Sequence, residues 1–207
     1  MPIFYGSNPQ RFNKPIRRYY YSWSEMRRKL LRSDQVVALK DYPLHNEHVL
    51  KIYFRVFNTK HGKILPSCPV IHKSRGVPFS LGRDRHSKDY NRALENFLKS
   101  HPKVQYFLID GNHKSTAAAL AGQRIPSLIL ESDGDVKKAK RMIKSDELFG
   151  VFRLGNTLQG EIDLLAKHFR KNFGKKPAFY TVAEKTKLLV RNRKVPKYMF
   201  AVRSGRK

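Results

Sequence analysis

The stretch that decides the fold is YFLIDGNHKSTAAALAG, which runs from Tyr106 to Gly122. Its apolar start, residues 106–109, predicts a buried strand, and Asp110-Gly111 predicts a turn. The alanine-rich remainder predicts a helix over residues 115–121 that Gly122 ends as a C-terminal cap. The loop between strand and helix would lie at a helix N-terminus, where free backbone N–H groups and the helix dipole favour an anion.

The same loop carries the residues expected to hold a phosphate. Glycine allows a ligand to approach the backbone closely, and the lysine adds a full positive charge. An ordinary strand–turn–helix with an Asx turn is the alternative interpretation. The predicted phosphate- or nucleotide-binding residues are Gly111, Asn112, His113, Lys114, Ser115 and Thr116.

The order of strand, Asp-Gly-Asn-His-Lys loop, alanine-rich helix and Arg-Ile-Pro-Ser-Leu-Ile-Leu over residues 124–130 resembles the core of the ParB/sulfiredoxin superfamily. The resemblance covers residues 37–131, interrupted by an insertion. It implies nucleotide-phosphate binding, with ATP, ADP or CTP and Mg²⁺ as the expected cofactors. Lys114 stands where the family usually has arginine, and lysine cannot form a bidentate fork to phosphate. Asn112 replaces the loop cysteine of sulfiredoxin, which argues against the sulfiredoxin reaction.

Alternating strand and helix signals predict an α/β (α+β) fold with a small mixed β-sheet flanked by helices. The chain divides into a basic, aromatic N-terminal extension at 1–35, a core at 36–150 with an insertion at 72–103, and a basic helical C-terminal extension at 151–207. Ser22 or Ser24 predicts the cap of a short helix that ends at Leu31. The other predicted strands are residues 36–39, 64–71 and 126–130, and the other predicted helices are 45–57, 87–100, 136–144, 157–173 and 182–192.

The charge of the chain points to a polyanion. Lys and Arg number 43 and Asp and Glu 16, which gives a net charge of +27. Such a large net charge causes self-repulsion, and the usual partner of a strongly basic protein is nucleic acid. We expect DNA more than RNA, and an anionic membrane surface is a weaker possibility. The N-terminal arginines alternate with Tyr and Trp, a pattern that can also stack on bases unless these rings pack on the core. The cations expected to contact nucleic acid are Arg17, Arg18, Arg27, Arg28, Lys185, Lys187, Arg191, Arg193, Lys194 and Lys197.

Several classes of protein are disfavoured. The single cysteine, Cys68, excludes internal disulfides and cysteine-rich zinc sites, and its apolar neighbours predict a buried side chain. His45 and His48 have a metal-like spacing without a third ligand, so no metal site is predicted. No run of about 18 apolar residues is present, and the N-terminus lacks an apolar signal core, so we expect a cytoplasmic protein without a membrane partner.

Two catalytic alternatives remain open. Free serine kinases of the superfamily carry a Pro-His-Glu element after the first strand, and here Pro43-Leu-His-Asn-Glu47 has a corresponding place with a different spacing. That resemblance implies Glu47 as a general base, with Asp110 and His113 organising the phosphate. The plainer interpretation of Glu47 is an exposed residue in a first helical turn. A ParB-like nuclease is the second alternative, for which Asp110, Asp133 and Asp135 are the available acids.

The two C-terminal helices leave a further choice. They form either a helix-turn-helix that reads a DNA groove or, more simply, a helical pair packed on the core with a basic outer face.

Overall fold

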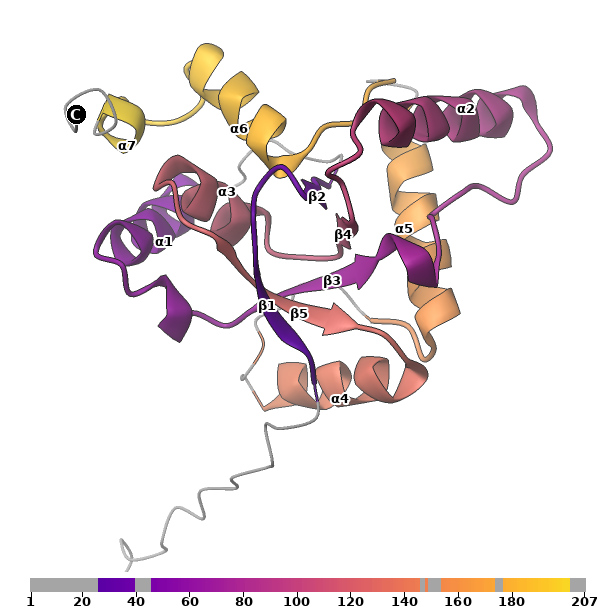
Figure 1. The fold of residues 1–207 in the computed structure, drawn as a ribbon, viewed down its shortest axis with the longest axis horizontal. Coiled ribbons are helices and arrows are strands. Elements are labelled where there is room, and N and C mark those ends of the chain that lie inside the picture. The colour runs from indigo at the N-terminus through magenta and orange to yellow at the C-terminus, as the bar shows by residue number, and fades with distance from the viewer. Residues whose placement is uncertain (1–25, 40–45, 146–147, 149–153, 174–176, 202–207) are drawn as a thin grey trace, which may run out of the picture.

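The computed structural model describes residues 26–39, 46–145, 148, 154–173 and 177–201. A five-stranded mixed sheet lies at its centre, with helices on both faces, as the α/β (α+β) prediction required (Figure 1). The strands are β1 (Arg28–Leu31), β2 (Val36–Val37), β3 (Cys68–His72), β4 (Tyr106–Leu108) and β5 (Ile125–Leu130). The helices are α1 (Glu47–Asn58), α2 (Arg85–Ser100), α3 (Asn112–Leu120), α4 (Asp133–Lys144), α5 (Leu158–Phe173), α6 (Val182–Arg191) and α7 (Tyr198–Ala201), with 3-10 turns η1 (Gly62–Ile64) and η2 (Lys73–Arg75).

The strand order is β1-β5-β3-β4-β2, so β3 is central. It pairs in parallel with β5, where Val70 lies opposite Ile129, and antiparallel with β4, where Val70 lies opposite Leu108. β2 pairs in parallel with β4, and β1 closes the other edge antiparallel to β5. A strand buried on both faces has no polar alternation, which is why β4 and β5 appear in the sequence as continuous apolar runs.

Two hydrophobic cores cover the two faces of the sheet. Along β5, Ile125 and Ile129 join the core that contains α1, α2, α3 and α6. Leu128 and Leu130 point the other way and join the core that contains α4. Alternate residues of a strand face opposite sides, so one strand supplies both cores.

The prediction of a short helix that ends at Leu31 is wrong for its C-terminal part. Residues 28–31 form strand β1, in register with residues 125–128 of β5. Ser22 and Ser24, the expected caps, lie outside the described residues. Without β1 the backbone of β5 would be left unpaired on that side, so pairing decides the conformation of a segment whose only buried side chain is Leu31.

Local signals set most other boundaries. The predicted capping box is present, because Thr181 and Glu184 exchange side-chain and backbone hydrogen bonds at the start of α6. Ser132 caps α4, and Gly122 has the predicted left-handed conformation at φ +70°. Three strands are shorter than predicted: β3 starts at Cys68 because residues 62–64 form η1, β2 ends at Val37, and β4 ends at Leu108.

Helices α5 and α6 do not form the expected pair. α6 packs against α3, whereas α5 packs against α2, and Figure 1 shows the two helices on different sides of the molecule. Both still contribute to one core, through Phe169 of α5 and Leu189 of α6. A helix-turn-helix needs its two helices in contact, so this arrangement gives the groove-reading alternative no support.

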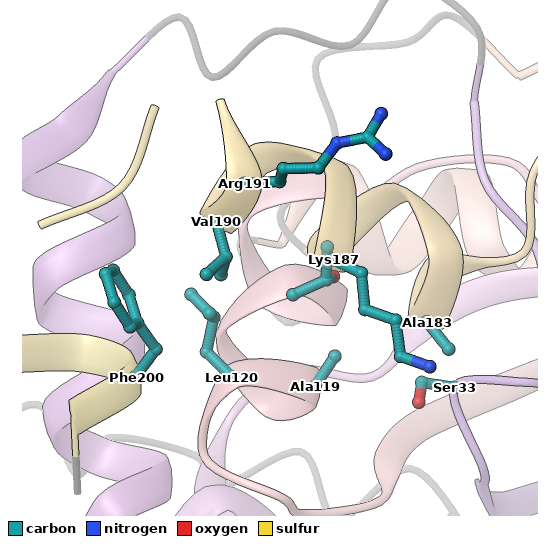
Figure 2. A pocket seen from close by; sticks show the side chains of 9 residues that line it. Ser33, Ala119, Leu120, Ala183, Lys187, Val190, Arg191 and Phe200 are labelled. Carbon is teal, nitrogen blue, oxygen red and sulfur yellow. The ribbon is translucent and has the colours of Figure 1, made fainter. Parts of the chain in front are cut away.

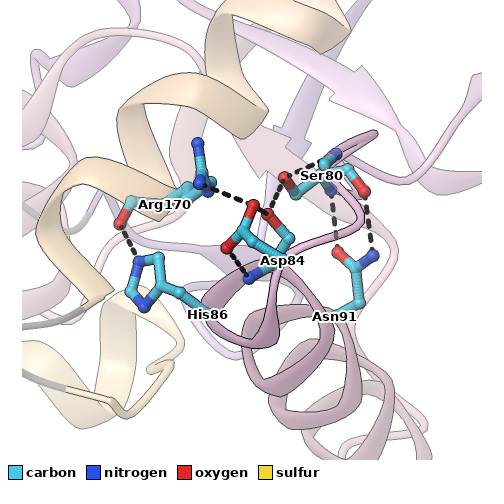
Figure 3. Close-up of polar contacts among 7 residues, drawn as sticks. Ser80, Asp84, His86, Asn91 and Arg170 are labelled. Atoms are coloured by element: carbon cyan, nitrogen blue, oxygen red, sulfur yellow. Dashed lines mark hydrogen bonds and ion pairs between the residues drawn. The ribbon is translucent and has the colours of Figure 1, made fainter.

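The insertion is held in place by polar contacts (Figure 3). Ser80 and Asn91 exchange backbone and side-chain hydrogen bonds, and the hydroxyl of Tyr90 donates to the Pro78 carbonyl at 2.5 Å. Asp84 caps α2, which starts at Arg85 and so earlier than predicted, and it also accepts from Arg170 of α5 at 3.0 Å. These contacts dock the insertion on α5. No helix among the described residues is long and apolar enough to cross a membrane.

Candidate phosphate site and basic surface

The turn between β4 and α3 requires a glycine. Gly111 has φ +103° and ψ 33°, a left-handed conformation that side chains rarely adopt. A Cβ atom at this position would lie 2.6 Å from Sγ of Cys68. The N–H of Gly111 donates to Oδ1 of Asp110 at 2.6 Å. Glycine also has no side chain, so the N-cap residue itself makes no side-chain hydrogen bond to the first turn of α3.

Helix α3 begins at Asn112 instead of Ser115, and this changes the role of two predicted ligands. Ser115 and Thr116 are buried, and their hydroxyls donate to the carbonyl of Asn112 at 3.1 and 2.7 Å. These hydroxyls therefore bond within their own helix and do not face the surface. Asn112 and His113 are only partly buried and lie where the helix N-terminus meets solvent.

Lys114 is the unexpected member of the loop, because its side chain is buried. It is 2% exposed, its Nζ donates to the carbonyl of Pro66, and Nζ lies 5.8 Å from the ring centroid of Tyr53. Across the described part of the chain, no carboxylate forms an ion pair with it. A buried ammonium without a carboxylate is costly, so the fold holds a positive charge below the start of α3 that an anion would offset.

A second helix start lies beside the first. The backbone N–H of Asn46, the N-cap of α1, donates to Nε2 of His113 at 3.3 Å. Figure 1 shows α1 and α3 next to each other on one face of the sheet, and they are in extensive contact. The positive ends of two helix dipoles therefore meet at His113. His45 lies outside the described residues.

Glu47 lies near this junction but is engaged elsewhere. Its Oε1 is 2.7 Å from Nζ of Lys51, one turn further along α1. The hydrogen bond from Lys51 and its positive charge lower the pKa of Glu47. A general base that works near neutral pH usually has a raised carboxylate pKa. The structure thus brings the segment of Glu47 to the loop without giving its carboxylate the environment of a poised base.

Burial changes the titration of the neighbouring side chains. The Cys68 thiol is fully buried as predicted, and burial raises its pKa to about 11. Burial also raises the pKa of Tyr53, with smaller contributions from Cys68 and Asp110. Both groups are therefore neutral at physiological pH beside the Lys114 charge.

The acids considered for a nuclease have separate structural roles. Asp133 Oδ1 accepts from the N–H of Leu158 at the start of α5, at 2.7 Å. Asp135 Oδ2 accepts from the N–H of Glu131 at 2.9 Å. Both belong to the first turn of α4, whereas Asp110 precedes α3. Among the residues that the structure describes, no three His, Cys, Asp or Glu side chains are grouped as metal ligands would be.

The predicted nucleic-acid-binding residues fall into two groups at opposite ends of β1. Arg27 pairs with Glu131 at 3.2 Å, and Arg28 is exposed on β1. The far end of β1 leads to α6, where the carbonyl of Ser33 accepts from the N–H of Ala183. Arg17 and Arg18 lie outside the described residues. The second group lies on α6 and in the segment that follows it, namely Lys185, Lys187, Arg191, Arg193, Lys194 and Lys197.

Sequence reasoning missed the partners of the site. Nothing in the order of residues shows that Pro66 and Tyr53 enclose Lys114, or that Asn46 is the residue that contacts His113. It also missed a basic face on α4, which exposes Lys137, Arg141 and Lys144. The spacing of these three residues at helical intervals was the available signal.

Comparisons with known proteins add no relatives. No family model matches the chain, and no curated protein and no solved structure is significantly similar to it. The likeness to the ParB/sulfiredoxin superfamily thus stays a prediction from the loop and its flanking elements.

Proposed function

We propose that this protein binds nucleic acid and holds a nucleotide or phosphate at the junction of α1 and α3, in the manner of a ParB-like core. Charge is the observation that carries the proposal: 43 basic residues face 16 acidic ones, for a net charge of +27. On α4 and α6, the exposed Lys137, Arg141, Lys144, Lys187 and Arg191 form no ion pair with any residue that the structure describes. A polyanion relieves this repulsion and gains entropy from released counterions.

The pocket half of the proposal draws on three features at one place. Gly111 leaves the first turn of α3 without a side-chain cap, and Asn46 brings the start of α1 to His113. Lys114 supplies a buried positive charge that forms no ion pair among the described residues. Two helix dipoles and a buried cation together favour a phosphate. ATP, ADP and CTP are the ligands to test, with and without Mg²⁺.

A salt titration tests the nucleic-acid half. The full-length protein is titrated with random-sequence DNA and RNA at about 50 and 200 mM salt, where electrostatic binding differs by orders of magnitude. We expect tight binding at the lower salt, a steep fall at the higher, and little dependence on sequence. Absence of binding to either polymer at the lower salt would refute the proposal. Nucleotide binding is measured in the same preparation, so the two halves fail separately.

Small-molecule phosphotransfer is a second candidate, favoured by the hydrogen bond between Asn46 and His113. It places the start of α1, and with it Glu47, beside the loop. If Glu47 is the base, Glu47→Gln abolishes transfer from ATP to a hydroxyl amino acid and leaves nucleic-acid binding unchanged. Glu95→Gln is the matched control, because Glu95 forms an equivalent pair with Lys99 on α2. Equal turnover by wild type and the Glu47 variant removes this candidate.

A further inference from the structure

The exposed side of α6 carries a ridge of two cations, Lys187 and Arg191, one helical turn apart. Neither forms an ion pair with any residue that the structure describes. Like charges at this spacing on a helix repel each other and destabilise it. The carboxylate nearest in the sequence, Glu184, already accepts hydrogen bonds from Thr181 and His101. The ridge therefore lacks a partner within its own helix.

A hollow of about 310 Å³ lies on one side of this ridge, between α6, α3 and α7. Its lining is mostly apolar, and Figure 2 shows the side chains of Leu120, Val190 and Phe200 directed into it. Lys187 and Arg191 also line it, and Figure 2 shows the amine of Lys187 directed toward Ser33 and the guanidinium of Arg191 directed the opposite way along α6. Val195 and Met199 are buried and so anchor the segment that carries Phe200. An aromatic ring is thus held at the edge of an open, cation-rimmed hollow.

A second hollow of about 310 Å³ lies on the other side of the same two cations, lined also by Tyr180, Leu188 and Glu184, whose carboxylate is held by Thr181 and His101. Nζ of Lys185 lies 5.5 Å from the ring centroid of Tyr180. Each side of the ridge therefore offers one aromatic ring. Proteins that bind single strands combine such basic tracks with aromatic rings on which bases stack.

We infer that α6 is a binding site for single-stranded nucleic acid, with backbone phosphates on Lys187 and Arg191 and bases placed against Phe200 and Tyr180. The inference rests on the proposed nucleic-acid function and specifies the form of the polymer. Charge complementarity selects a polyanion, and the aromatic hollows select unpaired bases, because a duplex keeps its bases stacked inside and offers only phosphates. Acidic peptides would complement the cations but would gain no base stacking.

Matched variants of the full-length protein test the inference by binding to a fluorescent oligo-dT and to a duplex of the same length. Lys187→Gln/Arg191→Gln removes the ridge, and Lys137→Gln/Arg141→Gln removes two exposed cations at the same spacing on α4, beneath the other face of the sheet. We expect the wild type to prefer the single strand. The α6 variant should lose that preference and reduce the single-strand salt slope by about 0.7 for each phosphate that it no longer neutralises. The α4 control variant should bind the single strand and the duplex more weakly by the same factor.

Phe200 is tested without a change of charge. Phe200→Leu keeps an apolar side chain and removes the ring, and we expect at least about five-fold weaker single-strand binding with unchanged duplex binding. Phe200→Tyr keeps the ring and should restore affinity, which separates stacking from a folding defect. Two results would overturn the inference: unchanged single-strand affinity in Phe200→Leu, or equal losses of single-strand and duplex affinity in the α6 variant. In either case, salt-dependent binding by the wild type would still support the proposed function. If the wild type binds neither the single strand nor the duplex, the proposed nucleic-acid function is itself refuted.

Discussion

His101 donates a hydrogen bond from Nε2 to Oε1 of Glu184 at 2.9 Å, which joins the end of α2 to the first turn of α6. Nδ1 of the same ring is 2.8 Å from the carbonyl of Phe97 and also acts as a donor there. Both ring nitrogens donate, so the contact favours the imidazolium. The insertion thereby helps to orient the basic helix α6.

The stability of this contact depends on pH. Burial alone would lower the pKa of His101, but the hydrogen bonds to Glu184 and Phe97 and the Glu184 charge raise it above its usual 6.5. The stabilisation is fully present below 6.5 and is lost as pH rises through the raised pKa. His101→Gln should therefore cost about 0.5–1 kcal/mol near pH 6 and less near pH 8. Urea unfolding at the two pH values checks this, with His61→Gln, an exposed histidine, as the control. Equal costs at both pH values would contradict it.

Sequence patterns located the elements whose local signals are complete. The strands over Tyr106–Leu108 and Ile125–Leu130 are continuous apolar runs because both of their faces are buried. The capping box at Thr181 is a local hydrogen-bond exchange, so four residues suffice to predict it. The core of the fold followed from these elements.

Elements that depend on distant partners were not predictable. β1 is a strand because β5 offers it an edge, and nothing within residues 28–31 favours that state over a helix. The start of α3 was missed because its N-cap is Gly111, which carries no side-chain signal. Lys114 was predicted as a phosphate-binding cation, and only its contacts with Pro66 and Tyr53 show that its side chain is buried, which is rare for lysine.

The buried ammonium of Lys114 can be removed with little change of shape. Lys114→Met keeps the length of the side chain and removes its positive charge. A buried charge that only a bound anion would neutralise is costly in the ligand-free protein. We expect the variant to be at least as stable as the wild type without ligand and to lose the stabilisation by ATP, ADP or CTP. For the wild type that stabilisation is about 2.7 kcal/mol at a hundred-fold excess over the dissociation constant. Thermal unfolding with and without each nucleotide measures both effects.

The control for this variant is Lys63→Met, because Lys63 is exposed on η1. If Lys114→Met is markedly less stable and still responds to nucleotide, the ammonium serves only to bind the Pro66 carbonyl, and the pocket proposal loses its cation.

The contact between Asp84 and Arg170 can be broken without loss of the helix cap. Asparagine caps as well as aspartate, so Asp84→Asn keeps the bond from the Ser87 N–H and replaces the oxygen that accepts from Arg170 and from the Ser87 hydroxyl. We expect faster amide exchange over residues 76–83, measured by hydrogen–deuterium exchange, with little change in α2. Asp89→Asn, which disrupts the looser pair with Arg85 at 3.9 Å, is the control and should leave that loop unchanged. Identical exchange in the two variants would show that the ion pair does not hold the insertion.

The interaction of Asp84 with Ser87 and Arg170 should be lost only at low pH. Hydrogen bonds from Ser87 and the Arg170 charge lower the pKa of Asp84 from 3.8 to about 2. Its contribution is present above pH 3.8 and is lost as pH falls through about 2. Loop exchange in the wild type should therefore rise only at the acid end of this range, after correction for the intrinsic rate.

The turn that opens α3 depends on Gly111 and Cys68 together. Gly111→Ala places a methyl group 2.6 Å from Sγ of Cys68 and forces a side chain into φ +103°. Backbone strain alone costs about 1–3 kcal/mol, and the steric conflict adds to it. Cys68→Ala/Gly111→Ala should recover the steric part and keep the strain, so a double-mutant cycle in urea separates the two. Gly134→Ala is the control, because its Cβ would meet nothing closer than 3.5 Å and alanine favours the helix. The reactivity of the Cys68 thiol gives a second measurement. Burial and a thiol pKa of about 11 should keep Cys68 of the wild type unreactive toward a chromogenic disulfide reagent at pH 8, whereas Cys68 of the Gly111→Ala variant should react faster. A Gly111→Ala protein as stable and as unreactive as Gly134→Ala would mean that this turn does not constrain the start of α3.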